Sequence, residues 1–373
     1  DRNGLRPLRY SITSDDLFFV GSESGMIKIP EERIIEKGKL GPGQIIAIDL
    51  KKGKLFKDKE IKDLLAKDYK KYNKQIVDLE KKISSEGEKP NFLGEDLRKR
   101  QFLSGLSIED LELILHPMAE EGKEASGSMG DDTPVAVLSS HFRPVSHYFR
   151  QNFSQVTNPP IDSLRENKVM SLKTRFGNLG NILDFDNLTE ENIYVLDSPI
   201  LSNSQFKKFK KFFTKKIKII DCTFDIEKSL KERIDSIRDE AETAVREGST
   251  CLVLSDKNIS NQKASIPSIL TVGAVHSHLV KHGLRGYCSL NVECSDAMDT
   301  HSFAILIGVG ATTVSPYLAI DSIYQRFEKK LFGKSEFETC VNKFKKSIDA
   351  GLLKIMSKMG ISVISSYRGG CNF

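Results

Sequence analysis

Apolar residues in the second half of the chain alternate between short continuous runs and longer stretches with a helical period. Four runs predict buried strands, KIKIIDCTF, TCLVLSD, YCSLNVEC and ATTVSPYLA, centred near residues 220, 253, 289 and 314. Residues 226–248, 266–283 and 299–310 lie between the runs and repeat apolar positions every three or four residues, which predicts helices. This order predicts an α/β fold with right-handed crossovers and one parallel sheet, a partial (β/α) barrel.

The first 56 residues have a different pattern. Stretches such as DDLFFVGSESGMIKI and GQIIAIDLKKGKLF predict short strands joined by glycine turns, a small β-rich segment ahead of the α/β region. Residues 61–85 are charged and predict mostly helix, and the SEGEKPN that follows (85–91) is typical of a linker.

A further helix is predicted in LSIEDLELILHPMAEEG, residues 106–122. Ser107 and Asp110 have the spacing of a capping box, with Asp in place of Glu. Because Pro117 disfavours a helical conformation at the residue before it, the helix is expected to end near His116.

Composition excludes two classes of partner. The 56 basic and 51 acidic residues are interleaved, and the Lys-rich stretch 51–74 lacks the aromatic residues of an RNA-binding face, so no nucleic acid is expected. Mean hydropathy is −0.31, and no apolar run approaches the roughly 20 residues that a membrane span needs. No membrane partner is expected either.

The six cysteines are scattered, without a CxxC pair, which favours reduced, buried thiols. We therefore expect a cytosol-like compartment, and the family resemblance described below implies the cytoplasm of a bacterium, with a plastid as the alternative. The chain opens with DRNGLRPLRY, in which a turn signal at Asn3-Gly4 precedes a strand-like alternation. This pattern suggests that residue 1 is not the start of the gene product.

Two loops carry candidate chemistry. GKEASGSMGDDTPVAVLSS (122–140) holds Met129, Asp131 and Asp132; the paired carboxylates could bind a cation or orient an amide, although capping of turns is the favoured reading. In FSQVTNPPIDSLRENKVMSL (153–172), two prolines after Asn158 fix an extended backbone, and Asp162 opens a helix.

The other candidate motifs are weaker. His278 and His282 share a helix face at the spacing of a zinc pair, but no HExxH glutamate accompanies them, so packing and helix C-terminal charge are favoured and no metal site is expected. Gly308-Val309-Gly310 follows a helix instead of a strand, which argues against a dinucleotide site. Cys288 and Cys294 lack the further cysteines of an iron-sulfur site and are expected in the core.

Taken in order, seven segments resemble the large (alpha) chain of glutamate synthase: DRNGLRPLRY, GSESGMIKIP, HPMAEEGKEASGSMGDDTPVAVLS, FSQVTNPPIDSLRENKVMSL, LDSPILS, IPSILTVGAVHSHL and DAGLLKIMSKMGISVISSYRGG. The resemblance implies four parts. Residues 1–75 would be the C-terminal part of a class II glutamine amidotransferase domain, 76–90 a linker, 91–365 the family's central domain, and 366–373 the entry to the FMN-binding synthase domain.

In this family, glutamine is hydrolysed by an N-terminal cysteine, and the ammonia travels through an internal tunnel to 2-oxoglutarate. FMN, supplied with electrons through an iron-sulfur cluster (3Fe-4S), reduces the product imine to glutamate. Residue 1 is Asp, so the resemblance implies that this chain holds no catalytic or cofactor-binding residue and is silent by itself. The expected partners are the remaining domains of the same polypeptide and an electron donor, either ferredoxin or a NAD(P)H-oxidising small subunit.

The resemblance implies a connecting role, in which the chain spaces two reaction centres. Contacts with the synthase side, or with the tunnel, are expected at Met129, Asp131, Asp132, Asn158 and Asp162. Two alternatives remain open: a stand-alone scaffold or binding protein of this fold, and a metal-assisted barrel-like enzyme that uses Asp131 and Asp132.

Overall fold

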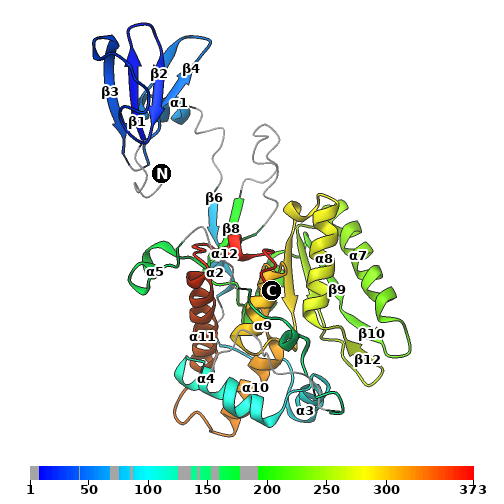
Figure 1. Ribbon diagram of the computed structural model, residues 1–373. Helices are drawn as coiled ribbons and strands as arrows, with labels where there is room; N and C mark the ends of the chain where they lie inside the picture. Colours follow the sequence, from blue (N-terminus) through cyan, green and yellow to red (C-terminus); the bar gives the residue numbers. More distant parts are fainter. Residues whose placement is uncertain are drawn as a thin grey trace. The chain divides into compact units, whose positions relative to one another are not determined.

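The computed structural model of the chain describes residues 8–41, 43–67, 75–84, 87–124, 136–140, 143–152, 159–176 and 192–373 (Figure 1). The chain divides into two compact units, Asp1–Asn73 and Lys74–Phe373. Each unit is described by itself. Within the described ranges, every helix is too short or too polar to cross a lipid bilayer.

The first unit is built from short antiparallel strands, in the sheet order β2-β1-β3. Its elements are β1 (Leu8–Thr13), β2 (Phe18–Gly21), η1 (Glu31–Arg33), β3 (Ile34–Leu40), the pair β4 (Ala47–Asp49) and β5 (Lys54–Phe56), and α1 (Asp58–Ala66). The Tyr10 ring stacks on Phe18 and lies over Gly38, where a Cβ would sit 2.3 Å from the ring. The predicted β-rich segment is confirmed.

The second unit contains a parallel sheet of four strands in the order β14-β13-β11-β9. In chain order, the strands and the helices that follow them are β9 (Ile217–Asp221), α7 (Leu230–Arg246), β11 (Cys251–Ser255), α8 (Ser268–Lys281), β13 (Ser289–Glu293), α9 (Thr300–Gly308), β14 (Thr313–Ser315) and α10 (Tyr317–Glu328). The predicted α/β class and its parallel sheet are confirmed. Pro267 is the N-cap residue of α8.

Both faces of this sheet are covered. Leu252 and Leu254 of β11 belong to the large core that includes residues of α7, α8 and α9. Cys251 and Val253 point the other way, into a second cluster with Phe206 and Phe209 of α6 (Asn203–Phe212). Because both faces of the sheet are buried, the sequence of β11 is a continuous apolar run and does not alternate between apolar and polar residues.

Residues 75–78 correct the prediction of helix over 61–85. They form β6 (Gln75–Asp78), which pairs in parallel with β8 (Asn192–Leu196), while β7 (Thr174–Phe176) pairs antiparallel with β8. The short helix α2 (Leu79–Ile83) follows, and its two end residues are fully buried. The partner strand lies more than one hundred residues away, so a local pattern could not reveal it. The expected division at 76–90 remains a prediction.

The helix predicted to end near His116 continues. Ser107 and Asp110 form the expected capping box, and a π-helical turn, η3 (Asp110–Leu115), leads directly into α4 (His116–Glu121), which ends at Gly122 with a φ of 72°. Pro117 therefore lies within a continuous helical segment, directly after its π-helical turn. The remaining elements are α3 (Gly94–Leu103), η4 (Val145–Tyr148), α5 (Ser163–Val169), β10 (Thr223–Asp225), β12 (Lys263–Ser265), η6 (Arg285–Tyr287), α11 (Phe337–Lys358) and α12 (Ile364–Tyr367).

Candidate functional site

Polar side chains gather where the parallel strands end. β11 ends at Ser255 and is followed by Asp256, and β13 ends at Glu293. The carboxyl ends of parallel strands meet at one edge of a sheet, and ligands of open α/β sheets bind outside that edge. This edge is therefore the candidate functional site.

Glu293 forms the charged part of the site and is only 4% exposed. Its Oε1 lies 2.8 Å from the ammonium groups of both Lys210 and Lys257, and its Oε2 accepts a hydrogen bond of 2.9 Å from Ser255. Burial opposes ionisation of Glu293, but the two ammonium groups outweigh burial and lower its pKa. The carboxylate is therefore ionised and fixed in place, which suits a structural or orienting role.

Asp256 is the neighbouring buried carboxyl. Its Oδ2 accepts hydrogen bonds from the backbone and the hydroxyl of Ser295, at 2.9 and 2.7 Å. Its Oδ1 has no hydrogen-bond partner within the described ranges. Burial, and then the charge of Asp296, raise the pKa of Asp256 to about 7. A carboxyl with such a pKa can hold or release a proton near neutral pH.

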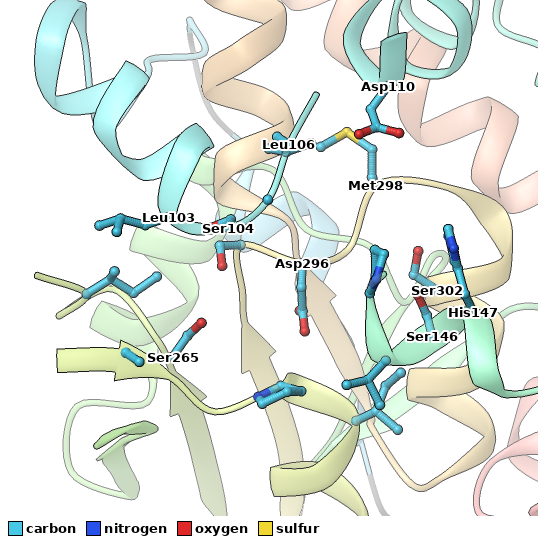
Figure 2. A pocket seen from close by; sticks show the side chains of 18 of the residues that line it. Leu103, Ser104, Leu106, Asp110, Ser146, His147, Ser265, Asp296, Met298 and Ser302 are labelled. Carbon is cyan, nitrogen blue, oxygen red and sulfur yellow. The ribbon is translucent and has the colours of Figure 1, made fainter. Parts of the chain in front are cut away.

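A cavity of about 310 Å³ lies beside this edge (Figure 2). Figure 2 shows Asp296 between Ser104 and Ser265 on one side and Ser146, His147 and Ser302 on the other. Apolar side chains line much of the remaining wall: Leu103, Leu106, Ile114, Val145, Ile226, Ile259, Ile269, Met298 and Leu306. A volume of this size is at the lower end of small-molecule sites, which begin at roughly 300 Å³.

Asp299 and Asp296 at the cavity wall differ in their hydrogen bonds. Asp299 caps α9 by accepting a hydrogen bond of 3.0 Å from the backbone of Ser302. Asp296 accepts one of 2.9 Å from the backbone of Ser268, but its Oδ1 is buried without a partner among the described residues. That free acceptor could bind the hydrogen of a cationic or amide group that entered the cavity.

Of the five residues expected at an interface, only Asp162 lies within the described ranges, and it does not line this cavity. Met129, Asp131, Asp132 and Asn158 lie outside the described residues. Asp162 is exposed and caps α5, accepting hydrogen bonds of 3.0 Å each from the backbones of Leu164 and Arg165. An interface role for these five residues remains a prediction.

The histidines lie in two environments. His276 is half-buried and accepts a hydrogen bond of 3.1 Å from Arg285; burial, and then the nearby arginine charges, lower its pKa to about 4. His278 instead contacts Glu242 of α7, with 2.6 Å between His278 Nε2 and Glu242 Oε2. Sequence spacing missed this carboxylate because it lies on another helix.

The other weak motifs behave as expected. Gly308-Val309-Gly310 follows the helix α9, and Cys288 and Cys294 are buried in the core. Asp256, Glu293 and Asp296 were not among the residues predicted for a site. Their signal is nevertheless visible, because SD and ECSD directly follow the apolar runs TCLVL and SLNV.

Comparison with known proteins gives two adjacent family matches. Residues 99–373 match the glutamate synthase central domain, and residues 1–74 match the glutamine amidotransferases class-II. Solved structures of flavocytochrome b2 align at 15% identity and a TM-score of 0.28, over 44% of this chain and 36% of that one. This score is too low to indicate a shared fold.

Curated relatives extend the comparison along the whole chain. It is 54% identical to the glutamate synthase [NADPH] large chain of Azospirillum brasilense, over 100% of this chain and 25% of that protein. Identity is 40% to the glutamate synthase [NADPH] large chain of Bacillus subtilis, over 99% of this chain and 24% of the relative. Sequence identity to ferredoxin-dependent glutamate synthase 2 of Synechocystis is 39%, over 99% of this chain and 25% of the relative. The chain thus spans about a quarter of the length of these relatives.

Proposed function

The chain belongs to the glutamate synthase family, and we propose that it is the connecting region of an enzyme that makes L-glutamate from L-glutamine and 2-oxoglutarate. The observation that carries the proposal is the tandem match, amidotransferase over 1–74 and then central domain over 99–373. A chain that spans the passage from one domain to the next is placed to set the distance between two reaction centres.

Within the described ranges, the residues do not fit the cofactors of such an enzyme. An iron-sulfur cluster needs several cysteine ligands around one point. Cys251 lies in one hydrophobic cluster, four other cysteines (Cys222, Cys288, Cys294 and Cys340) lie in the large core, and Cys371 is exposed. Gly310 offers no room for a flavin phosphate, because a Cβ there would already lie 2.3 Å from the His276 ring. FMN and the cluster therefore belong to other parts of the polypeptide in this proposal.

The proposed contribution of the chain is positional. Ammonia released from glutamine is a small solute, and it is retained only if the path between the two centres is closed to water. The ion pairs of the buried Glu293 carboxylate and the fully buried α9 favour a closely packed, rigid arrangement of this part of the chain. We assign the contacts with the synthase side to Met129, Asp131, Asp132, Asn158 and Asp162.

The partners in this proposal are the other domains of the same polypeptide and an electron donor. Relatives carry both the NADPH and the ferredoxin-dependent name, so either a NAD(P)H-oxidising small subunit or ferredoxin serves as the donor. Six free cysteines favour a reducing compartment. On that ground, and because relatives come from Azospirillum brasilense and Bacillus subtilis, we assign the chain to the cytoplasm of a bacterium.

The test compares two reactions of the complete enzyme that carries this chain. Glutamine-dependent synthesis needs ammonia to be transferred internally, whereas synthesis from added ammonium does not. Asp131→Asn together with Asp132→Asn, and separately Asp162→Ala, are expected to lower the first rate at least about tenfold, a change of about 1.4 kcal/mol, and to leave the second unchanged. Asp239→Asn, an exposed carboxylate of α7, is the matched control. If the glutamine-dependent rate of every variant equalled that of the parent, the assigned contacts would be refuted.

A further inference from the structure

A cluster of three metal-ligating side chains lies where α7 and α8 run side by side (Figure 1). Glu242 belongs to α7, whereas His278 and His282 lie at the end of α8. Oε2 of Glu242 is 2.6 Å from Nε2 of His278 and 3.8 Å from Nδ1 of His282. The two imidazole centroids are 4.3 Å apart, and one ligand atom from each of the three residues lies within 4.8 Å of the others.

The fold explains why these residues meet. α7 and α8 each follow one of two neighbouring parallel strands, β9 and β11, and both crossovers are right-handed, so the two helices cover the same face of the sheet. His278 and His282 are four residues apart and therefore share one side of the helix. The third ligand lies 36 residues before His278 in the sequence.

We propose that Glu242, His278 and His282 bind one zinc-type divalent cation, with water in the remaining position. Two imidazole nitrogens and one carboxylate oxygen form a donor set that zinc accepts. Bonds of about 2.0 to 2.1 Å in a tetrahedron separate the ligand atoms by about 3.3 Å. The separations from Glu242 Oε2, 2.6 and 3.8 Å, lie on either side of that value. Small side-chain rotations reach it.

The surroundings support the cluster in two ways. Arg246 binds the other oxygen of Glu242 at 2.7 Å, so the carboxylate is oriented and Oε2 remains for the metal. The side chains of Glu242, His278 and His282 are 21, 18 and 35% exposed, which gives the ion an entry path. The ion replaces the contact between His278 and Glu242 and that of His282 Nδ1 with the His278 carbonyl oxygen, 2.9 Å away.

Such an ion has a mechanical consequence. It adds a metal link between the two helices in place of the contact between Glu242 and His278, because Glu242 lies on one helix and both histidines on the other. The site is separate from the cavity at the carboxyl edge, whose wall contains none of the three residues. The ion therefore clamps α7 to α8 and takes no part in chemistry at that edge.

The test is a titration of the purified chain with Zn²⁺ alone at neutral pH, in competition with a chromophoric chelator. We expect one Zn²⁺ per chain with a dissociation constant of about 1 µM or tighter, and no competition from Mg²⁺ or Ca²⁺, which prefer oxygen ligands. His278→Ala, His282→Ala and Glu242→Gln should each weaken binding at least about tenfold. Glu240→Gln is the matched control, because Glu240 lies on the same helix and pairs with Lys218.

Two further readouts keep the test decisive if a variant folds poorly. Unfolding of each metal-free variant is followed by circular dichroism, and the same Zn²⁺ concentration should raise the midpoint for the parent and for Glu240→Gln by more than for Glu242→Gln. Co²⁺ bound to the parent should give the intense visible absorption of a four-coordinate site. Absence of saturable Zn²⁺ binding, or an unchanged dissociation constant in both folded histidine variants, would overturn the proposal.

Discussion

The hydroxyl of Thr313 donates a hydrogen bond of 2.7 Å to the side-chain oxygen of Asn291 and so joins strands β14 and β13. The amide nitrogen of Asn291 donates to the backbone carbonyl of Leu252, 3.0 Å away on β11. One fully buried amide therefore connects three of the four parallel strands.

Replacement of Asn291 by Ala should be costly for this reason. We expect Asn291→Ala to lower the free energy of unfolding by about 3 kcal/mol, because it removes several buried hydrogen bonds and leaves a small cavity. Urea denaturation measures the change. Asn258→Ala, at an exposed asparagine, is the control and should change stability by no more than about 0.5 kcal/mol. Equal effects of the two substitutions would contradict the bridging role.

Two helical glycines should respond in opposite directions to alanine. A Cβ at Gly351 of α11 would lie 2.4 Å from Cγ2 of Thr300, at the start of the fully buried α9, whereas nothing lies within 4 Å of a Cβ at Gly273 of α8. Gly351→Ala should lower the free energy of unfolding by about 1 to 3 kcal/mol. Gly273→Ala should raise it by up to about 1 kcal/mol. Thermal unfolding of both variants, each compared with the parent, checks the pair. A stable Gly351→Ala would mean that α9 and α11 do not approach so closely.

Asp256 should make the parent less stable as pH rises. Its pKa is about 7 when folded, against 3.8 for the ordinary group. Between these values the folded chain binds more protons than the unfolded chain, so the free energy of unfolding falls with rising pH. The Asp256→Asn variant has no carboxyl to ionise at this position, so it does not show this fall in the free energy of unfolding. Its stability relative to the parent should increase by up to about 4 kcal/mol between about pH 4 and about pH 8.

Urea denaturation at a series of pH values measures that difference. Ser302→Ala serves as a control, since its hydroxyl caps α9 and does not contact Asp256. A difference between Asp256→Asn and the parent that stays constant over the pH range would show that Asp256 is ionised normally.

Glu293 should have the opposite pH dependence. Its pKa is lowered from 4.5, so its stabilising contribution is complete above that pH and is lost as pH falls through the folded pKa. At neutral pH, Glu293→Gln should cost about 2 to 3 kcal/mol, less than a fully buried pair because both lysines are partly exposed. Lys257→Met should cost less, since Lys210 still pairs with the carboxylate.

Urea denaturation at neutral and acid pH tests this pair of substitutions. The gap between Glu293→Gln and the parent should close on acidification, and a gap that widens instead would be evidence against the ion pairs.

The alternation of strands and helices after residue 216 was predictable because buried parallel strands are apolar on both faces. The run TCLVLSD shows this clearly, as Leu252 and Val253 enter different clusters and both are fully buried. Strand β6 was not predictable, because its partner β8 is distant and its own residues lie in a charged stretch. The helix around Pro117 was misjudged because a proline within a helix resembles a stop signal in sequence, and the π-helical turn before it leaves no sequence signal.

The candidate site was harder to predict than the fold. Its cavity is assembled from separate stretches around Ser104, Ser146, Ser265 and Asp296, and spacing along the chain says nothing about such encounters. The histidine pair was visible because both residues lie on one helix. The contribution of Glu242 could not be predicted, because only the packing of α7 against α8 brings this residue near His278.

Of the six cysteines, five are buried and only Cys371 is exposed. A folded chain should therefore react with one equivalent of a thiol reagent, which gives a natural attachment point for a spectroscopic label close to the C-terminus. The other five thiols, at Cys222, Cys251, Cys288, Cys294 and Cys340, become reactive only when the α/β core opens. The number of modified thiols per chain therefore measures the fraction of chains whose core has opened. This measurement does not need tryptophan fluorescence, and the sequence has no tryptophan.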